Sequence, residues 1–368
     1  MRICNDGNID GLYKIAKTQK CQDTLLAINY RVCFVGENRL IFLPGEIEVK
    51  IASEDMDFFS SLCECDVIEV ASTGQVWKRF EKKAGDNTLY ITDKCNSNCI
   101  MCPMPETVRK NGLEVIPERL WELVSYMPSD LPHVTITGGE PFLAKDEMFN
   151  ILDYLKRKCV STEFLLLSNG RAFSIEGYAE KLKNTAPARF CIGIPIHGNT
   201  ASLHDSISQT DGSFNQTYIG IKNLIKQDID VEIRIVVSKL NAAHITDIAK
   251  MIVTDFPKVS SVKIMAMEML GNAAVNQNKV WLPYDEFFDY VKDAVDILVE
   301  GLIDVAIYNM PLCLVDESYW FICKQSISDY KIRYFDKCDI CKVKDACGGV
   351  FSGTYRFLEE SINPINHD

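Results

Sequence analysis

The chain has 368 residues, of which 47% are hydrophobic and 24% are charged, a balance typical of a globular protein with a sizeable core. Its formal net charge of −12 argues against nucleic-acid binding, which depends on neutralising phosphates. Because no run approaches the roughly 18 apolar residues of a membrane span, and the amino terminus lacks the pattern of a secretory signal, we expect a cytoplasmic protein that binds no membrane.

The first expected unit covers residues 1–85. It contains extended runs at 25–34, 40–43 and 67–70, separated by turns rich in glycine and proline. We predict a small β-rich amino-terminal module. A sheet edge in such a module could hold an extended peptide by strand addition.

The second expected unit, residues 86–305, alternates short β-branched runs with amphipathic stretches. The expected strands are 89–92, 134–137, 164–168, 190–196, 231–237 and 262–267. The expected helices are 117–126, 146–158, 175–184, 213–227, 241–254 and 284–300. Six β–α units in succession predict an α/β fold with a parallel sheet, best described as a partial (β/α)6 TIM-type barrel. The periodic pattern of apolar residues then fades. Residues 306–368 are expected to form a cysteine-rich carboxyl-terminal extension.

Three of these strands end in loops rich in small or polar residues. The loops contain Thr137-Gly138-Gly139, Ser168-Asn169-Gly170 and Ile196-His197-Gly198. The carboxyl ends of parallel strands form the functional face of such folds. We therefore expect these loops to meet at one site.

Fifteen cysteines are many for a cytoplasmic protein, and an odd number argues against a fully paired disulfide framework. Metal or iron–sulfur ligation is the leading interpretation for two clusters of cysteines. These are Cys95, Cys99 and Cys102, and then Cys313, Cys323, Cys338, Cys341 and Cys347. The isolated cysteines are expected to act as small hydrophobic residues. They are Cys4, Cys21, Cys33, Cys159 and Cys191, whereas Cys63 and Cys65 form an ambiguous pair.

The first cluster has the spacing C-x3-C-x2-C. This spacing also fits one face of an amphipathic helix, but Asn96-Ser97-Asn98 favour turns, and Pro103 and Pro105 follow directly. A structural zinc site takes four ligands, and no fourth lies nearby in the sequence. Three thiolates can hold three irons of a 4Fe–4S cluster and leave the fourth iron open, an arrangement that indicates chemistry at the metal.

The second group of cysteines contains enough ligands to close a metal site. Cys338, Cys341 and Cys347 follow the pattern C-x2-C-x5-C, and Cys313 can provide a fourth ligand. Four thiolates suit either zinc or a 4Fe–4S cluster, and the spacing does not decide between them. Cys323, in an aromatic context, is expected to be a buried core thiol.

The three-cysteine motif at the end of the first expected strand resembles the radical S-adenosylmethionine (radical SAM) superfamily. Residues 136–141 match the GGEP loop of that family, and residues 167–170 resemble the end of its third strand. The resemblance implies that Cys95, Cys99 and Cys102 hold a 4Fe–4S cluster. It implies cofactor-binding roles for Met101, Gly138, Gly139, Glu140, Ser168, Asn169 and Arg234.

Among these residues, Glu140 would pair with the amino group of SAM. The residue before the third cysteine is usually aromatic in the family, and Met101 stands there instead. A flexible thioether can still pack against adenine. Arg234 lies inside an apolar strand, so a pair with a neighbouring carboxylate explains it equally well.

The resemblance also implies the chemistry. An electron passes from the reduced cluster into SAM, which splits into methionine and a 5′-deoxyadenosyl radical, and this radical abstracts hydrogen from a substrate. The electron donor would be a protein such as flavodoxin or ferredoxin. His197 and Glu268 are candidates for handling protons near the substrate radical, although a histidine beside glycine is also an ordinary turn residue.

The carboxyl-terminal region is similar to the twitch or SPASM-like modules of radical SAM peptide maturases. Residues 309–313, 325–329 and 348–351, together with 267–273, resemble the C-type radical SAM maturase of the His-Xaa-Ser system. This resemblance implies an auxiliary 4Fe–4S cluster on Cys313, Cys338, Cys341 and Cys347. It implies a precursor peptide as substrate and a partner radical SAM maturase. A radical SAM enzyme acting on a small metabolite and a non-enzymatic metal-binding protein are the alternatives.

Overall fold

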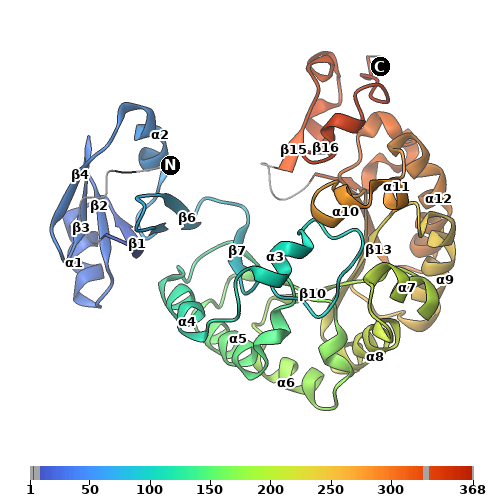
Figure 1. Cartoon of the computed structure of the whole chain (residues 1–368), viewed down its shortest axis with the longest axis horizontal. Helices are drawn as coiled ribbons and strands as arrows, with labels where there is room; N and C mark the ends of the chain where they lie inside the picture. Colours follow the sequence, from blue (N-terminus) through green and yellow to red (C-terminus); the bar gives the residue numbers. More distant parts are fainter. Residues whose placement is uncertain (1–2, 4–8, 326–330, 367–368) are drawn as a thin grey trace.

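A computed structural model describes residue 3 and residues 9–325 and 331–366 of the chain. Cys4 and most of the 325–329 stretch therefore lie outside the described residues. Figure 1 shows an amino-terminal module beside a ring of strands and helices, with the carboxyl-terminal segment against one side of the ring. The β-rich module and the partial barrel predicted from the sequence are both present.

The amino-terminal module is a six-stranded sheet in the order β4-β3-β2-β1-β5-β6. Its strands are β1 (Gly11–Ala16), β2 (Val32–Val35), β3 (Arg39–Leu43), β4 (Ile47–Lys50), β5 (Val67–Val70) and β6 (Val76–Phe80). Only β1 and β2 pair in parallel, and α1 (Gln19–Ala27) connects them. A short helix, α2 (Met56–Ser61), precedes β5.

The expected extended run at 25–34 is wrong in its first part. Leu25 lies in α1, and β2 begins only at Val32. The side chain of Thr18 caps this helix by accepting the N–H of Cys21 at 3.3 Å. The apolar residues at its end therefore continue a capped helix instead of beginning a strand.

The second unit is an eight-stranded sheet in which the spatial order follows the sequence, from β7 to β14, and every neighbouring pair is parallel. Its strands are β7 (Asn87–Tyr90), β8 (His133–Thr137), β9 (Glu163–Leu167), β10 (Phe190–Pro195), β11 (Asp230–Val236), β12 (Ser261–Met265), β13 (Asp304–Tyr308) and β14 (Cys323–Lys324). The expected domain boundary at residue 305 thus falls inside β13.

Helices cover the outer face of this curved sheet (Figure 1). They are α4 (Pro117–Tyr126), α5 (Asp146–Lys158), α6 (Tyr178–Thr185), α8 (Ser213–Lys226), α9 (Ile245–Asp255) and α12 (Tyr284–Glu300). In β11, Val231, Ile233 and Ile235 are buried, while the alternating residues Glu232 and Arg234 are only partly buried. Because side chains alternate along a strand, these two charged residues share the face opposite the buried apolar row.

Smaller elements surround the carboxyl ends of the strands. They are α3 (Glu106–Asn111), α7 (Ala201–Ser208), α10 (Gly271–Val275) and α11 (Gln277–Val280). The carboxyl-terminal segment adds a small hairpin of β15 (Ile332–Arg333) and β16 (Val350–Phe351). Within the described residues, no helix combines the length and apolar character that crossing a membrane requires.

The amino-terminal module contacts the barrel at the end of α4. The hydroxyl of Tyr30 donates to the carbonyl of Ser125 at 2.8 Å, and the N–H of Arg31 donates to the hydroxyl of Tyr126 at 3.1 Å. Next to these bonds, Lys82 and Asp130 form an ion pair at 2.5 Å. The module is therefore fixed to the barrel by backbone and side-chain contacts.

Candidate functional site

The three cysteines Cys95, Cys99 and Cys102 lie on an irregular loop that follows β7, as the turn-forming residues between them predict. Burial, together with the neighbouring Cys95 and Cys102, raises the pKa of the Cys99 thiol to about 12. Burial likewise raises the pKa of Cys95 to about 11. The three thiols are thus close enough to influence one another. Across the described chain, no three His, Cys, Asp or Glu side chains converge on a single ion position.

The GGEP loop lies directly against the start of the cysteine loop. The N–H of Gly139 donates to the carbonyl of Thr92 at 2.7 Å, and the N–H of Glu140 donates to the carbonyl of Lys94 at 2.8 Å. A Cβ on Gly139 would lie 2.1 Å from the Lys94 oxygen. Only glycine permits this approach, so the two predicted loops meet because the sequence has no side chain there.

Glu140 joins the GGEP loop to the next one. Its buried carboxylate accepts hydrogen bonds from the Phe142 N–H at 3.0 Å, the Ser168 hydroxyl at 2.9 Å and the Asn169 N–H at 2.8 Å. Burial raises the pKa of this carboxyl, and the three donors oppose that shift. The structure thus brings together three of the residues singled out from the sequence. Pairing of Glu140 with an amino group stays a prediction.

The loop containing Ser168 and Asn169 also holds the cysteine loop. The amide of Asn169 donates to the side-chain oxygen of Asn96 at 2.6 Å. Arg171 donates to the carbonyl of Asn96 at 2.7 Å and to the hydroxyl of Ser97 at 3.0 Å. The first half of the cysteine loop is therefore anchored by the end of β9.

The second half of the loop is held by Asn272, which lies in the 267–273 stretch but was not among the predicted site residues. Its amide nitrogen donates to the Cys99 carbonyl at 3.1 Å and to the Asn98 side-chain oxygen at 3.2 Å. Its side-chain oxygen accepts the N–H of Glu106 at 3.0 Å, and its own N–H donates to the Cys102 carbonyl at 2.9 Å. In the sequence, Gly271-Asn272 is an ordinary turn signal, and the partners lie some 170 positions away.

Met101 is buried in an apolar cluster at the same end of the barrel. The other buried members are Ile207, Met267, Met269, Ala273 and Val280. Its expected contact with adenine stays a prediction. Two of these neighbours, Met267 and Met269, carry flexible thioethers like its own.

Arg234 pairs with an acid of its own strand. Its guanidinium lies 3.1 Å from the Glu232 carboxylate and 3.4 Å from the sulfur of Met265. This is the ion pair that the sequence offered as one explanation of the residue. The side chain is still 27% exposed, so contact with a ligand in the barrel also stays a prediction.

The two proton-handling candidates lie in different surroundings. His197 is buried with its ring centroid 5.0 Å from that of His204, and burial lowers its pKa to about 3. Its Nδ1 atom has no hydrogen-bond partner among the described residues. Such an imidazole is neutral at physiological pH, so it can form hydrogen bonds but does not act as a protonated acid. Glu268 instead lies 3.6 Å from Lys331 of the carboxyl-terminal segment.

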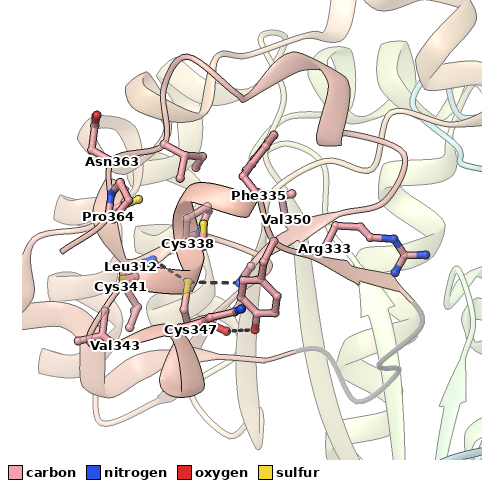
Figure 2. Close-up of a pocket in the computed structure, with 16 residues that line it drawn as sticks. Leu312, Arg333, Phe335, Cys338, Cys341, Val343, Cys347, Val350, Asn363 and Pro364 are labelled. Atoms are coloured by element: carbon pink, nitrogen blue, oxygen red, sulfur yellow. Dashed lines mark hydrogen bonds between the residues drawn. The ribbon is translucent and has the colours of Figure 1, made fainter. Parts of the chain in front are cut away.

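The carboxyl-terminal cysteines surround one pocket, which Figure 2 shows. Cys313, Cys338, Cys341 and Cys347 all line it. The sulfur of Cys347 accepts N–H groups of Leu312 and Gly349 at 3.4 Å each, and that of Cys341 accepts the Ile365 N–H at 3.4 Å. The predicted fourth ligand, Cys313, is therefore brought to the other three.

Cys323 lies outside that set. It is buried on β14 and its thiol donates to the Tyr319 carbonyl at 3.7 Å. The prediction of a buried core thiol is confirmed.

The donors at both sites fit iron–sulfur chemistry. Each is a set of thiols gathered from loops, three in one case and four in the other, and thiolates are the ligands that iron–sulfur clusters take. Backbone N–H groups aimed at the sulfurs of the second set are a further feature of such sites, because they stabilise negative charge on the ligands.

Comparison with known proteins agrees with this geometry. Residues 89–252 match the family described as Radical SAM superfamily, a family that uses a 4Fe–4S cluster and SAM. The AdoMet-dependent heme synthase of Methanosarcina barkeri is 29% identical over 157 residues, which cover 42% of this chain and 43% of that protein. The antilisterial bacteriocin subtilosin biosynthesis protein AlbA of Bacillus subtilis is 25% identical over 209 residues, covering 57% of this chain and 46% of AlbA.

A solved structure has a similar fold. The crystal structure of Streptococcus suis SuiB superposes with a TM-score of 0.50 and 14% identity, covering 62% of this chain and 50% of SuiB. The chain thus spans half or less of the length of each of these three proteins. The family match covers the cysteine loop, the GGEP loop and the strands that carry them. Residues 89–252 are therefore similar to the Radical SAM superfamily, and they carry both the cysteine loop and the GGEP loop.

Proposed function

We propose that the chain is a radical SAM enzyme that modifies a ribosomally made precursor peptide. The observation that carries the proposal is the three-thiol loop, partly buried and hydrogen-bonded to the GGEP loop within the segment that matches the family. Three thiols, with no fourth cysteine and no histidine on the loop, leave a coordination position for a ligand, which is the arrangement of a catalytic site.

The residues of the chain would share the work as follows. Cys95, Cys99 and Cys102 would hold the 4Fe–4S cluster, and the glycines of the GGEP loop would leave room for SAM beside it. When bound, the cluster and SAM supply the 5′-deoxyadenosyl radical. Glu140 would hold the GGEP loop and the Ser168-Asn169 loop at a fixed separation, since its carboxylate already bonds both. The unpartnered Nδ1 of buried His197 would take a hydrogen bond from a ligand at this end of the barrel.

The second set of thiols would hold an auxiliary 4Fe–4S cluster, with zinc as the other candidate. Support comes from the three N–H groups that point at Cys341 and Cys347. Hydrogen bonds to the sulfurs tune the potential of a cluster, and this role suits electron transfer.

A peptide substrate is supported by AlbA, whose name assigns it to bacteriocin biosynthesis. The narrower proposal of a His-Xaa-Ser type maturase, working with a partner maturase, rests on the resemblance of the carboxyl-terminal sequence. The amino-terminal module would hold the peptide at a sheet edge, because β4 and β6 are the end strands of its sheet within the described residues. Peptide affinity should therefore fall when residues 1–85 are removed, and unchanged affinity would contradict this role.

The experiment that tests the proposal uses anaerobically reconstituted protein with SAM, a reductant and candidate precursor peptides. We expect a mass change in the peptide together with 5′-deoxyadenosine, and neither product with Cys99→Ala. A small-metabolite substrate is the second candidate, favoured by the similarity to a heme synthase. Turnover of a metabolite without modification of any peptide would make a small metabolite the first candidate substrate and a peptide the second.

A further inference from the structure

The cysteine loop has a buried cation beside it that the proposed function leaves unassigned. Arg109, in the last turn of α3, is only 7% exposed. Its guanidinium donates to the side-chain oxygen of Asn98 and, at 3.1 Å, to the carbonyl of Met104. Asn98 is the residue directly before Cys99, so the charge lies against the loop itself.

Among the described residues, no carboxylate forms an ion pair with this guanidinium. The nearest acid along the helix, Glu106, pairs with Lys110 at 2.6 Å, and both side chains are largely exposed. A buried charge without a counter-charge is costly. On the loop side, Arg109 donates to the Asn98 side-chain oxygen and the Met104 carbonyl, and it lines the same pocket as Cys95.

Several linked hydrogen bonds fix the position of Arg109. The oxygen of Asn98 that accepts from Arg109 also accepts from the amide of Asn272 at 3.2 Å. Asn272 in turn bonds the carbonyl of Cys99 and the N–H of Glu106, the residue that begins α3. The guanidinium is thus held by the same hydrogen-bond set that fixes the shape of the loop.

We propose that Arg109 acts through its charge. Its fixed guanidinium beside Cys95 and Cys99 sets the reduction potential of the 4Fe–4S cluster held there. The inference rests on the proposed function. A 4Fe–4S cluster on three thiolates is anionic, and it gains one further negative charge when an external reductant gives it one electron. A nearby cation stabilises the reduced form more than the oxidised form, so it raises the potential.

The test compares midpoint potentials of the three-cysteine cluster, measured by anaerobic redox titration with dithionite and electron paramagnetic resonance. Arg109→Gln should make reduction about tenfold less favourable, a fall of about 59 mV for a one-electron couple. Arg109→Lys keeps the charge and should stay close to the wild type. Lys110→Gln is the matched control, because it removes an exposed charge one residue away and should leave the potential unchanged.

Each result of this comparison either supports or overturns the role of the Arg109 charge. An Arg109→Gln protein that holds its cluster at the wild-type potential would overturn the inference, as would an equal shift in Lys110→Gln. If Arg109→Gln folds by circular dichroism but loses the cluster, retention by Arg109→Lys supports the role of charge, and loss by both variants refutes it. A wild-type protein that cleaves SAM while Arg109→Gln shows an unchanged potential contradicts only this inference, whereas a wild type without a cluster at the three cysteines contradicts the proposed function.

Discussion

At the scale of single residues, the site depends on a few buried polar groups that each bond several segments. Glu140 is the clearest case, because three donors from two loops reach one carboxylate. A glutamine in its place would present an amide NH2 to at least one of these donors. An unsatisfied buried group costs about 1–3 kcal/mol.

We therefore predict that Glu140→Gln lowers the free energy of unfolding by about 1–3 kcal/mol in urea denaturation. The control is Glu163→Gln, because the Glu163 side chain is 53% exposed and pairs with Arg189 at the surface. That variant should stay within about 0.5 kcal/mol of the wild type. Equal stability of the two variants would show that the three bonds of Glu140 contribute nothing beyond a surface pair.

At the scale of elements, two separate segments of the chain hold the cysteine loop. The end of β9 anchors Asn96 and Ser97, and α10 anchors Asn98, Cys99 and Cys102. The same α10 segment follows Met267, whose carbonyl accepts the hydroxyl of buried Thr354 at 3.0 Å. The carboxyl-terminal segment is thus bonded to the loop that supports the three-cysteine site.

Asn272→Ala should release the second half of the cysteine loop, since it removes three side-chain hydrogen bonds at once. We expect iron to fall from about eight atoms per chain toward about four, with the second site still filled. Asn223→Ala is the control, because within the described residues the Asn223 side chain makes one hydrogen bond, to the Phe173 carbonyl at 2.9 Å. Iron and sulfide would be measured in both variants. Full iron content in Asn272→Ala would contradict the role of α10 in holding the cysteine loop.

Much of this arrangement could be predicted from the sequence, because it depends on short-range patterns. Alternating β-branched runs and amphipathic stretches predicted β7 to β12, and α4, α5 and α12 begin and end where expected. The loops after β8 and β9 could be placed at one site from the rule that parallel strands end on one face. Helix α1 was missed because apolar residues at its end look like a strand when the cap is not weighed.

The supporting residues of the site could not be predicted. Arg109 and Asn272 are ordinary in the sequence, one in a short polar helix and the other in a turn. The partners of Asn272 are 166 to 174 positions away, and those of Arg109, 5 and 11 positions away, are reached only because the loop between them is irregular. No local periodicity or spacing reports such contacts. Cysteines, in contrast, are chemically distinctive, so their grouping in the sequence, with the family resemblance, indicated both candidate sites.

At the scale of the whole molecule, the two cysteine sites differ in what they leave open. The first has three thiols and lies at the carboxyl ends of the barrel strands, beside the loops that the family match covers. The second has four thiols around one pocket (Figure 2). Three ligands leave a position for a reacting ligand, whereas four close the site. On this account, chemistry takes place at the first site and the second supports it.

The most direct test of this account is reductive cleavage of SAM by the anaerobically reconstituted full chain, with 5′-deoxyadenosine measured by mass spectrometry. We predict that the wild type forms it, that Cys99→Ala forms none, and that Cys347→Ala loses iron only from the second site and still cleaves SAM. No 5′-deoxyadenosine from wild-type protein with its full iron content, or undiminished formation by Cys99→Ala, would contradict the assignment of the three-cysteine loop as the reacting centre.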